Sequence, residues 1–469
     1  MVAKKRKQST DVEEHPWENF QLPEGAVQDE QLCSNCNRID FQQALSVPNT
    51  EIASWGIPIT KSRTDFDPDC SLCTYVFRRV STGNNVYNGS DERHTESNSY
   101  HWRVLECLWP LKIFRSGMER LKRADNVIAA VCGPPANVKT RSKISEGLSR
   151  AMLLPLVGDL NLLHNSQNDF IYRGCVVRSS SPDYHNLRGR VDRCYDSRDG
   201  HNLCKQPPVV IDFKSRVIDC KNRKIVPLKP GLTYIALSYV WGVDSAADHI
   251  DESLSEGASV PLPVAQTIED AMIFVQRLGE RYLWVDRFCI WRSENKHLQI
   301  EKMHKIYQGA KTTIVALNSE NADSGLTGVS RPRTTQQSFH TRACCLVSNF
   351  ANLSHHMSTS IWSTRGWTYQ EALLSRSCLF FTQDQIYFAC KTWVRSEDVE
   401  QSEIQPAQDR LGASLFDCDR HGYGRMPKAH VPESFAVKLM EYTRRSLTFD
   451  SDALNAFKGI IAVNEQYTY

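Results

Sequence analysis

The sequence contains no stretch of about 18 apolar residues and no apolar leader core near its N-terminus. The first absence argues against a membrane span, and the second argues against secretion. Together they predict a soluble, cytoplasmic protein. The N-terminal basic run of Lys4, Lys5, Arg6 and Lys7 fits a solvated tail or a nuclear import signal, so nuclear localisation is the alternative.

The chain also lacks a strong excess of charge of either sign. Its 56 Lys and Arg residues nearly balance 54 Asp and Glu residues, which leaves a net charge of +2. A field this weak does not favour nucleic acid or an anionic membrane as an obligatory partner. Glycine-rich phosphate loops of the G-x-G-x-x-G or Walker type are absent as well, which argues against a kinase or a Rossmann dehydrogenase.

What the chain does contain is typical of a globular protein with several domains. It has 469 residues, of which 41% are apolar and 23% charged. The distribution of apolar and polar stretches predicts five segments: a disordered tail over 1–31, a cysteine-rich N-terminal module over 32–110, an irregular connecting region over 111–230, an α/β domain over 231–391, and a polar insert with C-terminal helices over 392–469.

The α/β prediction rests on how apolar residues are spaced after residue 230. Strand-length apolar runs near 234–240, 282–286 and 312–317 alternate with segments of helical period. This alternation is typical of strand–helix–strand units, so we expect a three-layer domain with a mainly parallel sheet and these three strands at its centre. Residues 378–382 and 385–390 are expected to follow as a late hairpin or as sheet edges.

The cysteines suggest a metal site. The chain has 16 of them, and without a leader they are expected to stay reduced or to bind metal rather than to form disulfides. Cys33-x-x-Cys36 and Cys70-x-x-Cys73 are two thiolate pairs of the kind that completes a tetrahedral zinc shell. They form the predicted zinc site, and reduced buried thiols without metal are the alternative.

Four segments carry the strongest functional signal. They read Tyr-Ile-Ala-Leu-Ser-Tyr-Val-Trp-Gly at 234–242, Leu-Trp-Val-Asp-Arg-Phe-Cys-Ile at 283–290, Ile-Glu-Lys-Met-His-Lys-Ile-Tyr at 300–307 and Arg-Gly-Trp-Thr-Tyr-Gln-Glu at 365–371. In this order they resemble the signature of the fungal heterokaryon incompatibility (HET) domain family, which is distantly similar to TIR domains. The resemblance implies a TIR-like or flavodoxin-like core and a role in self/non-self recognition and programmed cell death.

The first two segments place polar and aromatic groups where open α/β sheets bind ligands, at the carboxyl ends of strands. Ser238, Tyr239 and Trp241 close the first strand, and Asp286 follows the second. We expect these groups to line one ligand-binding cleft. The alternative is that the rings belong to the core and that Asp286 caps a helix.

The fourth segment resembles the Trp-x-x-x-Glu helix of TIR domains, which implies that Glu371 is a catalytic residue in the hydrolysis of NAD. Trp367 and Glu371 share one helix face beside Arg365, so a ring and a carboxylate could flank a bound ribose. Trp367 and Arg365 are therefore counted among the ligand-binding candidates. The alternative is a surface Glu371 paired with Arg365 and a Trp367 anchored in the core.

Two functional hypotheses follow from the resemblance. In one, the domain assembles with protein partners or with itself to signal incompatibility, without chemistry. In the other, it is a TIR-like effector with NAD as its substrate. Trp291 and Arg292 replace a polar pair that is usual in the family, and a bulky pair at a strand end favours the first hypothesis.

A second group of potential metal ligands lies just upstream of the four segments. Cys194, His201 and Cys204 resemble a Cys-x-x-x-His-x-x-Cys pattern that often precedes HET domains, with a wider first gap. Three ligands leave a tetrahedral site incomplete. The alternative is two core thiols and a surface histidine.

Overall fold

The computed structural model describes residues 32–33, 57–60, 67–72, 74, 100–105, 127–132, 152–155, 172–198, 201, 204–205, 209–242, 256–290, 296–340, 345–348, 350–351, 353–391, 394–401 and 435–465. The chain divides into two compact units. One comprises Met1–Cys107, Arg120–Val176 and Gln337–Asn349, and the other comprises Leu108–Glu119, Val177–Gln336 and Phe350–Tyr469. The first unit therefore takes a short segment from within the α/β part of the sequence.

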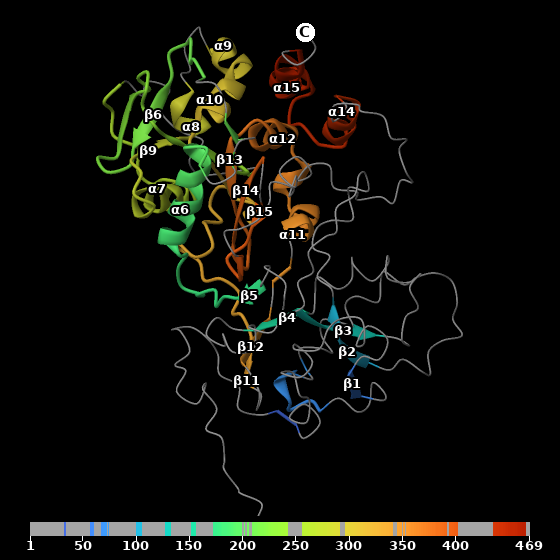
Figure 1. The fold of residues 1–469 in the computed structure, drawn as a ribbon. Coiled ribbons are helices and arrows are strands. Elements are labelled where there is room, and N and C mark those ends of the chain that lie inside the picture. Colours follow the sequence, from blue (N-terminus) through green and yellow to red (C-terminus); the bar gives the residue numbers. More distant parts are fainter. Residues whose placement is uncertain are drawn as a thin grey trace, which may run out of the picture. The chain divides into compact units, whose positions relative to one another are not determined.

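The first unit contains a six-stranded sheet of order β1-β2-β3-β4-β12-β11. Its strands are β1 (Ile57–Thr60), β2 (Tyr100–Leu105), β3 (Val127–Cys132), β4 (Met152–Pro155), β11 (Ser338–His340) and β12 (Cys345–Ser348), and Figure 1 labels them. All of these pairings are antiparallel. The short strand β5 (Tyr172–Gly174) also lies in this unit. A regular sheet thus occupies segments that lack clear alternation in the sequence.

The second unit is built on an eight-stranded sheet of order β15-β14-β13-β10-β8-β9-β6-β7. The strands, in chain order, are β6 (Arg216–Asp219), β7 (Lys224–Pro227), β8 (Ile235–Ser238), β9 (Tyr282–Trp284), β10 (Thr313–Val315), β13 (Ser377–Phe381), β14 (Ile386–Cys390) and β15 (Val394–Arg395). A further short strand, β16 (Val399–Gln401), follows them.

The sheet of the second unit is mixed, whereas the sequence predicts a mainly parallel one. Its centre is parallel, since β10 pairs in parallel with both β13 and β8, and β8 pairs in parallel with β9. Both ends are antiparallel, because short turns join β13 to β14 and β6 to β7 as hairpins. The prediction that three strands near 234–240, 282–286 and 312–317 are central is confirmed, as is the late hairpin.

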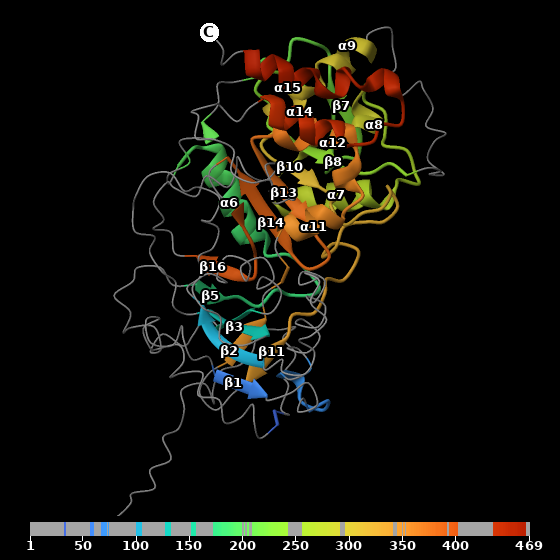
Figure 2. The ribbon, with the colours of Figure 1, turned by 90° about the vertical axis from the view of Figure 1, so that its right-hand side faces the viewer.

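Helices cover both faces of this sheet (Figures 1 and 2). The helices are α6 (Tyr184–Tyr195), α7 (Gln266–Arg277), α8 (Asp286–Cys289), α9 (Lys296–Glu301), α10 (Met303–Gly309), α11 (Leu353–Thr359), α12 (Gly366–Leu373), α14 (Phe435–Thr443) and α15 (Asn455–Glu465). Side chains of α6, α7 and α10 share one apolar core, and side chains of α11, α12, α14 and α15 share a second. The predicted three-layer arrangement is therefore present.

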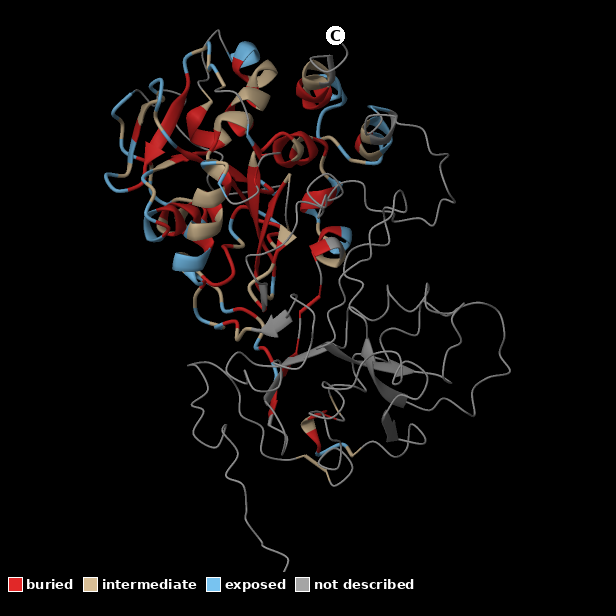
Figure 3. Ribbon diagram, viewed as in Figure 1, coloured by how far each residue is buried: buried red, intermediate tan, exposed pale blue. Residues whose placement is uncertain are grey.

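The strands between the two cores alternate as a sheet covered on both faces should. Along β13, Leu379 and Phe381 belong to the first core, while Cys378 and Phe380 belong to the second. Every residue of β8, β10, β13 and β14 is buried, and Figure 3 shows the burial concentrated in this sheet and in the helices against it. Such complete burial fixes the strand ends firmly.

The C-terminal segment, residues 444–459, contacts α12 at two points. The amide of Gly366, the first residue of α12, donates to the carbonyl of Ser446 at 2.8 Å. A Cβ at Gly366 would lie 2.6 Å from Leu447 Cδ2, so the Leu447 side chain packs closely against the start of α12. At the other end of the segment, the Gly459 amide of α15 donates to Gln370 Oε1 at 2.8 Å.

Across the ranges given above, the structure contains no helix with the length and apolar character needed to cross a membrane.

Candidate functional site

The carboxyl ends of the parallel strands bring the sequence-predicted residues together. Ser238 is the last residue of β8, and Asp286 follows β9 as the first residue of α8. Because β8 and β9 are parallel neighbours, these two positions lie at the same edge of the sheet. Two polar clusters form there. An inner cluster comprises Ser238, Tyr307, Trp362 and Glu371, and an outer cluster comprises Tyr239, Trp241, Asp286 and Arg287.

The inner cluster is a chain of hydrogen bonds around the Glu371 carboxyl. The Ser238 hydroxyl donates to Glu371 Oε2, and Trp362 Nε1 donates to Ser238 Oγ at 2.8 Å. Tyr307 lies beside the carboxyl, and its hydroxyl donates to the Leu237 carbonyl at 3.2 Å. Glu371 is only 6% exposed, so the alternative that placed this carboxylate on the surface is wrong. The helix face that carries it is covered by the sheet edge.

Burial raises the pKa of Glu371 to about 8. The negative charge of Asp286 contributes to this rise, while the hydrogen bond from Ser238, the charge of Arg365 and the contact with the Tyr307 hydroxyl oppose it. Glu371 is therefore mostly protonated at neutral pH. A protonated carboxyl can donate to the Tyr307 oxygen while accepting from Ser238, which satisfies every polar atom of the inner cluster.

The outer cluster holds an exposed ring at the edge of the sheet. Trp241 is 37% exposed, and its Nε1 donates to Asp286 Oδ2 at 2.9 Å. The Asp286 carboxylate also accepts from the backbone amide of Arg287 at 2.7 Å, and the Arg287 guanidinium lies 5.9 Å from the centre of the Trp241 ring. Asp286 thus is the first residue of α8 and orients Trp241, but it does not cap the helix, since Val285 is the N-cap residue and no side chain caps this end.

The outer carboxylate titrates close to physiological pH. Burial raises the pKa of Asp286 to about 6, against the lowering effects of the Arg287 amide and of Trp241 and Tyr239. Tyr239 is 4% exposed, and burial together with the neighbouring Asp286 charge raises the pKa of its hydroxyl. Since Asp286 acts on the pKa of Glu371, the two clusters are electrostatically coupled.

The other two ligand-binding candidates face the C-terminal segment. Trp367 Nε1 donates to Asp452 at 3.4 Å, and the Trp367 ring packs against both apolar cores. The carbonyl of Arg365 accepts from the Arg445 side chain at 3.2 Å. The structure therefore places Trp367 and Arg365 on the side of α12 that contacts 444–459, in agreement with the anchoring alternative for Trp367.

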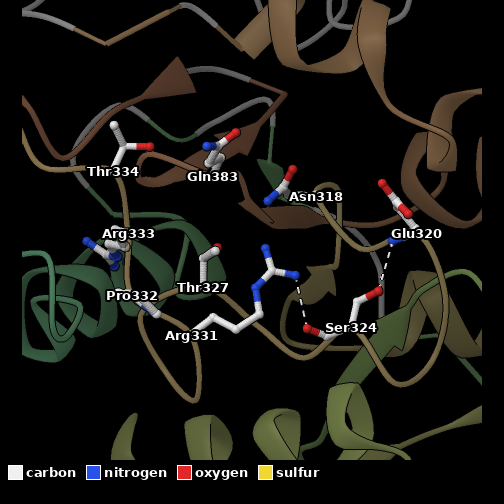
Figure 4. A pocket seen from close by; sticks show the side chains of 9 residues that line it. All are labelled: Asn318, Glu320, Ser324, Thr327, Arg331, Pro332, Arg333, Thr334 and Gln383. Carbon is white, nitrogen blue, oxygen red and sulfur yellow. Dashed lines mark hydrogen bonds between the residues drawn. The ribbon is translucent and has the colours of Figure 1, made fainter.

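A pocket lies further along the same sheet edge. It has a volume of about 510 Å³, and Figure 4 shows its polar lining of Asn318, Glu320, Ser324, Thr327, Arg331, Pro332, Arg333, Thr334 and Gln383. Asn318 and Gln383 follow the carboxyl ends of β10 and β13, the position where open α/β sheets bind ligands. None of the lining residues is among the sequence-predicted candidates. All but Gln383 lie in the loop after β10, which lacks periodicity, and Gln383 lies in the turn between β13 and β14, so the sequence offers no signal for this pocket.

Of the predicted zinc ligands, Cys36 and Cys73 lie outside the described residues, so that site stays a prediction. A different set of ligands does come together. The side-chain ligand atoms of Cys194, His201, Cys204 and Cys390 all lie within 4.8 Å of one another, an arrangement that could hold a metal ion. Three of these residues were noted in the sequence, and Cys390 was not.

A known protein family matches the part of the chain that contains both the inner and the outer cluster. Residues 234–371 match the family described as heterokaryon incompatibility protein (HET). The chain carries a HET domain. Heterokaryon incompatibility protein 6, OR allele, from Neurospora crassa is 33% identical to this chain over 110 residues, which cover 21% of this chain and 16% of that relative. The chain thus spans less than a fifth of that relative's length. No solved structure gives a significant match.

The signature segments of the HET domain meet at the inner cluster. The first contributes Ser238, the third contributes Tyr307 and the fourth contributes Glu371. The second contributes Asp286, which reaches Glu371 through its charge. The motif residues are therefore spatial neighbours that connect β8, α8, α10 and α12. Trp291 and Arg292, where the chain departs from the family, lie outside the described residues.

Proposed function

We propose that this protein acts in fungal heterokaryon incompatibility, and that its HET domain signals through contact with protein partners or with a second copy of itself. The match to the HET family and the similarity to heterokaryon incompatibility protein 6 of Neurospora crassa support the first part. The second part rests on the outer cluster. Cell death as the outcome, and a cytoplasmic site of action, belong to the same proposal.

The observation that carries the proposal is the exposed, oriented ring of Trp241. Large aromatic residues dominate the binding energy of protein interfaces, and a ring that is held in one conformation loses little entropy on binding. Trp241 is held by the 2.9 Å hydrogen bond to Asp286, within reach of the Arg287 guanidinium. Arg287 itself is buried, so Trp241 is the residue of the outer cluster that can meet a partner, and tryptophan is enriched among interface hot spots.

The alternative, hydrolysis of NAD by Glu371, requires a carboxylate that is ionised and reaches the ribose. A negative charge is what stabilises oxocarbenium character as nicotinamide leaves. Glu371 is instead buried, bonded to Ser238 and mostly protonated at neutral pH. These properties support a role in joining α12 to β8 rather than in catalysis.

The test is expression of the full chain in a fungal host, with viability as the measurement. We expect wild type to reduce viability and Trp241→Ala to restore most of it at the same soluble level. Phe449→Ala is the matched control, because Phe449 is an aromatic residue that is 66% exposed and outside the outer cluster. Trp241→Phe keeps a ring but removes the donor to Asp286, so it separates the aromatic contact from the hydrogen bond.

Two results would contradict the proposal. One is a Trp241→Ala variant that folds as wild type does and kills as effectively. The other is an equal loss of killing in Phe449→Ala, which would show that the assay responds to any exposed ring rather than to this edge of the HET domain.

A further inference from the structure

We propose that Cys194, His201, Cys204 and Cys390 bind one zinc ion that fastens helix α6 to strand β14. The four residues come from three separate places in the chain. Cys194 lies in the last turn of α6, His201 and Cys204 lie in the turn that follows, and Cys390 ends β14. All four belong to the second unit of the structure.

The distances between the ligand atoms fit a tetrahedral zinc site. Zinc–sulfur bonds of about 2.3 Å and zinc–nitrogen bonds of about 2.0 Å place a sulfur about 3.5 Å from the nitrogen and about 3.8 Å from another sulfur. His201 Nδ1 lies 3.5 Å from Cys204 Sγ and 3.6 Å from Cys390 Sγ. All six separations among the four atoms are within 4.8 Å. One ion at the centre can therefore contact all four with little movement.

Burial distinguishes this set from ordinary surface residues. The exposed fractions are 0% for Cys194 and Cys204, 1% for His201 and 5% for Cys390. A histidine ring buried to this degree needs partners for its nitrogens, and its Nδ1 faces two sulfurs. A disulfide would use two of the three thiols and leave the third and the ring without a role, whereas a metal ion uses all four.

Other buried thiols in the described part of the second unit behave differently. The Cys220 and Cys378 thiols donate to backbone carbonyls at 3.8 Å, and Cys289 Sγ accepts from the Val285 amide at 3.3 Å. These thiols bond to backbone groups in an apolar core, with no histidine as a partner in these contacts. Only in the cluster of four do several thiols face one another around a histidine, among the residues searched.

The ligand set identifies both the metal and its role. Three thiolates and an imidazole in a tetrahedral arrangement favour zinc over magnesium or calcium, which prefer oxygen ligands. Four protein ligands leave no open position for water or substrate, as is typical of structural rather than catalytic zinc. Helix α6 lies against β14, so the ion would join the helix to the β13–β14 hairpin.

The test begins with the metal content of the purified full chain, measured by plasma mass spectrometry under reducing conditions. We expect Cys390→Ser to lose one equivalent of zinc relative to wild type. Cys378→Ser is the matched control, because it removes a buried thiol from the neighbouring strand without touching the cluster, and it should retain the full zinc content. Cys36→Ser reports separately on the N-terminal cysteine pairs.

A second measurement keeps the proposal testable if Cys390→Ser does not fold. Wild type stripped of metal and titrated with Co²⁺ should develop the intense thiolate-to-cobalt absorption of a tetrahedral site, and addition of zinc should abolish it. The proposal is overturned if wild type carries no zinc and gives no such band. It is also overturned if folded Cys390→Ser keeps its full zinc content, or if alkylation shows a disulfide within the cluster.

Discussion

Because the pKa of Glu371 is raised, the free energy of unfolding should depend on pH in the opposite sense to that expected for a carboxylate in a surface ion pair. The pKa rises from its ordinary value of 4.5 to about 8 in the folded chain, because burial disfavours the charged form. The folded state therefore holds the proton more tightly than the unfolded state. The stabilisation is complete below about pH 4.5 and is lost as the pH rises through about 8.

The size of this loss follows from linkage. With pKa values of 4.5 unfolded and about 8 folded, Glu371 lowers the free energy of unfolding by about 2.5 kcal/mol between roughly pH 5.5 and 7.5, at about 1.4 kcal/mol per pKa unit. Glu371→Gln removes the titration. An amide keeps the size of the carboxyl, can accept from Ser238 and can donate to Tyr307, so the variant should fold and should gain stability relative to wild type by that amount over this range.

The assay is urea unfolding followed by tryptophan fluorescence, at closely spaced pH values. Glu441→Gln is the control, since Glu441 pairs with Arg444 along α14 at 2.8 Å and should keep the wild-type pH dependence. Asp286 also has a raised pKa, and it is present in wild type, in Glu371→Gln and in Glu441→Gln. Its contribution to the pH dependence therefore cancels to first order when the free energies of unfolding of these proteins are compared. Parallel pH profiles for wild type and Glu371→Gln would refute the raised pKa and, with it, the neutral state of the carboxyl.

Three further substitutions test the packing around the site, each by the free energy of unfolding. Ser238→Ala leaves Trp362 Nε1 without its 2.8 Å acceptor and Glu371 without a donor, so we expect the free energy of unfolding to fall by about 1–3 kcal/mol. An unchanged free energy would show that the inner cluster is not formed. Tyr307→Phe removes both the donor to the Leu237 carbonyl and the acceptor for the protonated Glu371 carboxyl, so it should also cost about 1–3 kcal/mol, and an unchanged stability would contradict the place of Tyr307 in the inner cluster. Gly459→Ala places a Cβ 2.4 Å from the Cβ of His304 in α10, so α15 should be pushed away from α10 at a cost of about 1–3 kcal/mol, and an unchanged stability would contradict the packing of α15.

The sequence predicts the centre of the second unit well, for a physical reason. Strands near 234–240, 282–286 and 312–317 are apolar throughout, because helices cover both faces of the sheet, and such runs are readily identified. The late antiparallel hairpin of β13 and β14 is predicted as well, whereas the antiparallel pair of β6 and β7 escapes prediction, since pairing direction depends on turns and on sheet order rather than on composition. The six-stranded sheet of the first unit escapes it as well, because short strands without alternation resemble loops.

The candidate site was predicted in part. The convergence of Trp241 and Asp286 follows from their positions after neighbouring parallel strands. The burial of Glu371 could not be read from helical spacing, because the helix face that carries it is covered by β8 and α10, elements distant in sequence. Cys390 was missed for the same reason. Spacing along the sequence identifies metal ligands that are close together in the chain, such as Cys194, His201 and Cys204. Cys390 is far from them in sequence and joins the cluster only because β14 lies beside α6 in the folded chain.

The most direct test of the account is the viability of fungal cells that express Glu371→Gln at the same soluble level as wild type, with nicotinamide release from NAD measured in the same cells. The account predicts that the variant kills as wild type does, because Glu371 holds α12 to β8 in its neutral form and an amide can take its place. The contrary result is a folded Glu371→Gln variant that no longer kills while wild type both kills and releases nicotinamide. That result would establish Glu371 as a catalytic residue and would replace contact-based signalling with chemistry in this HET domain.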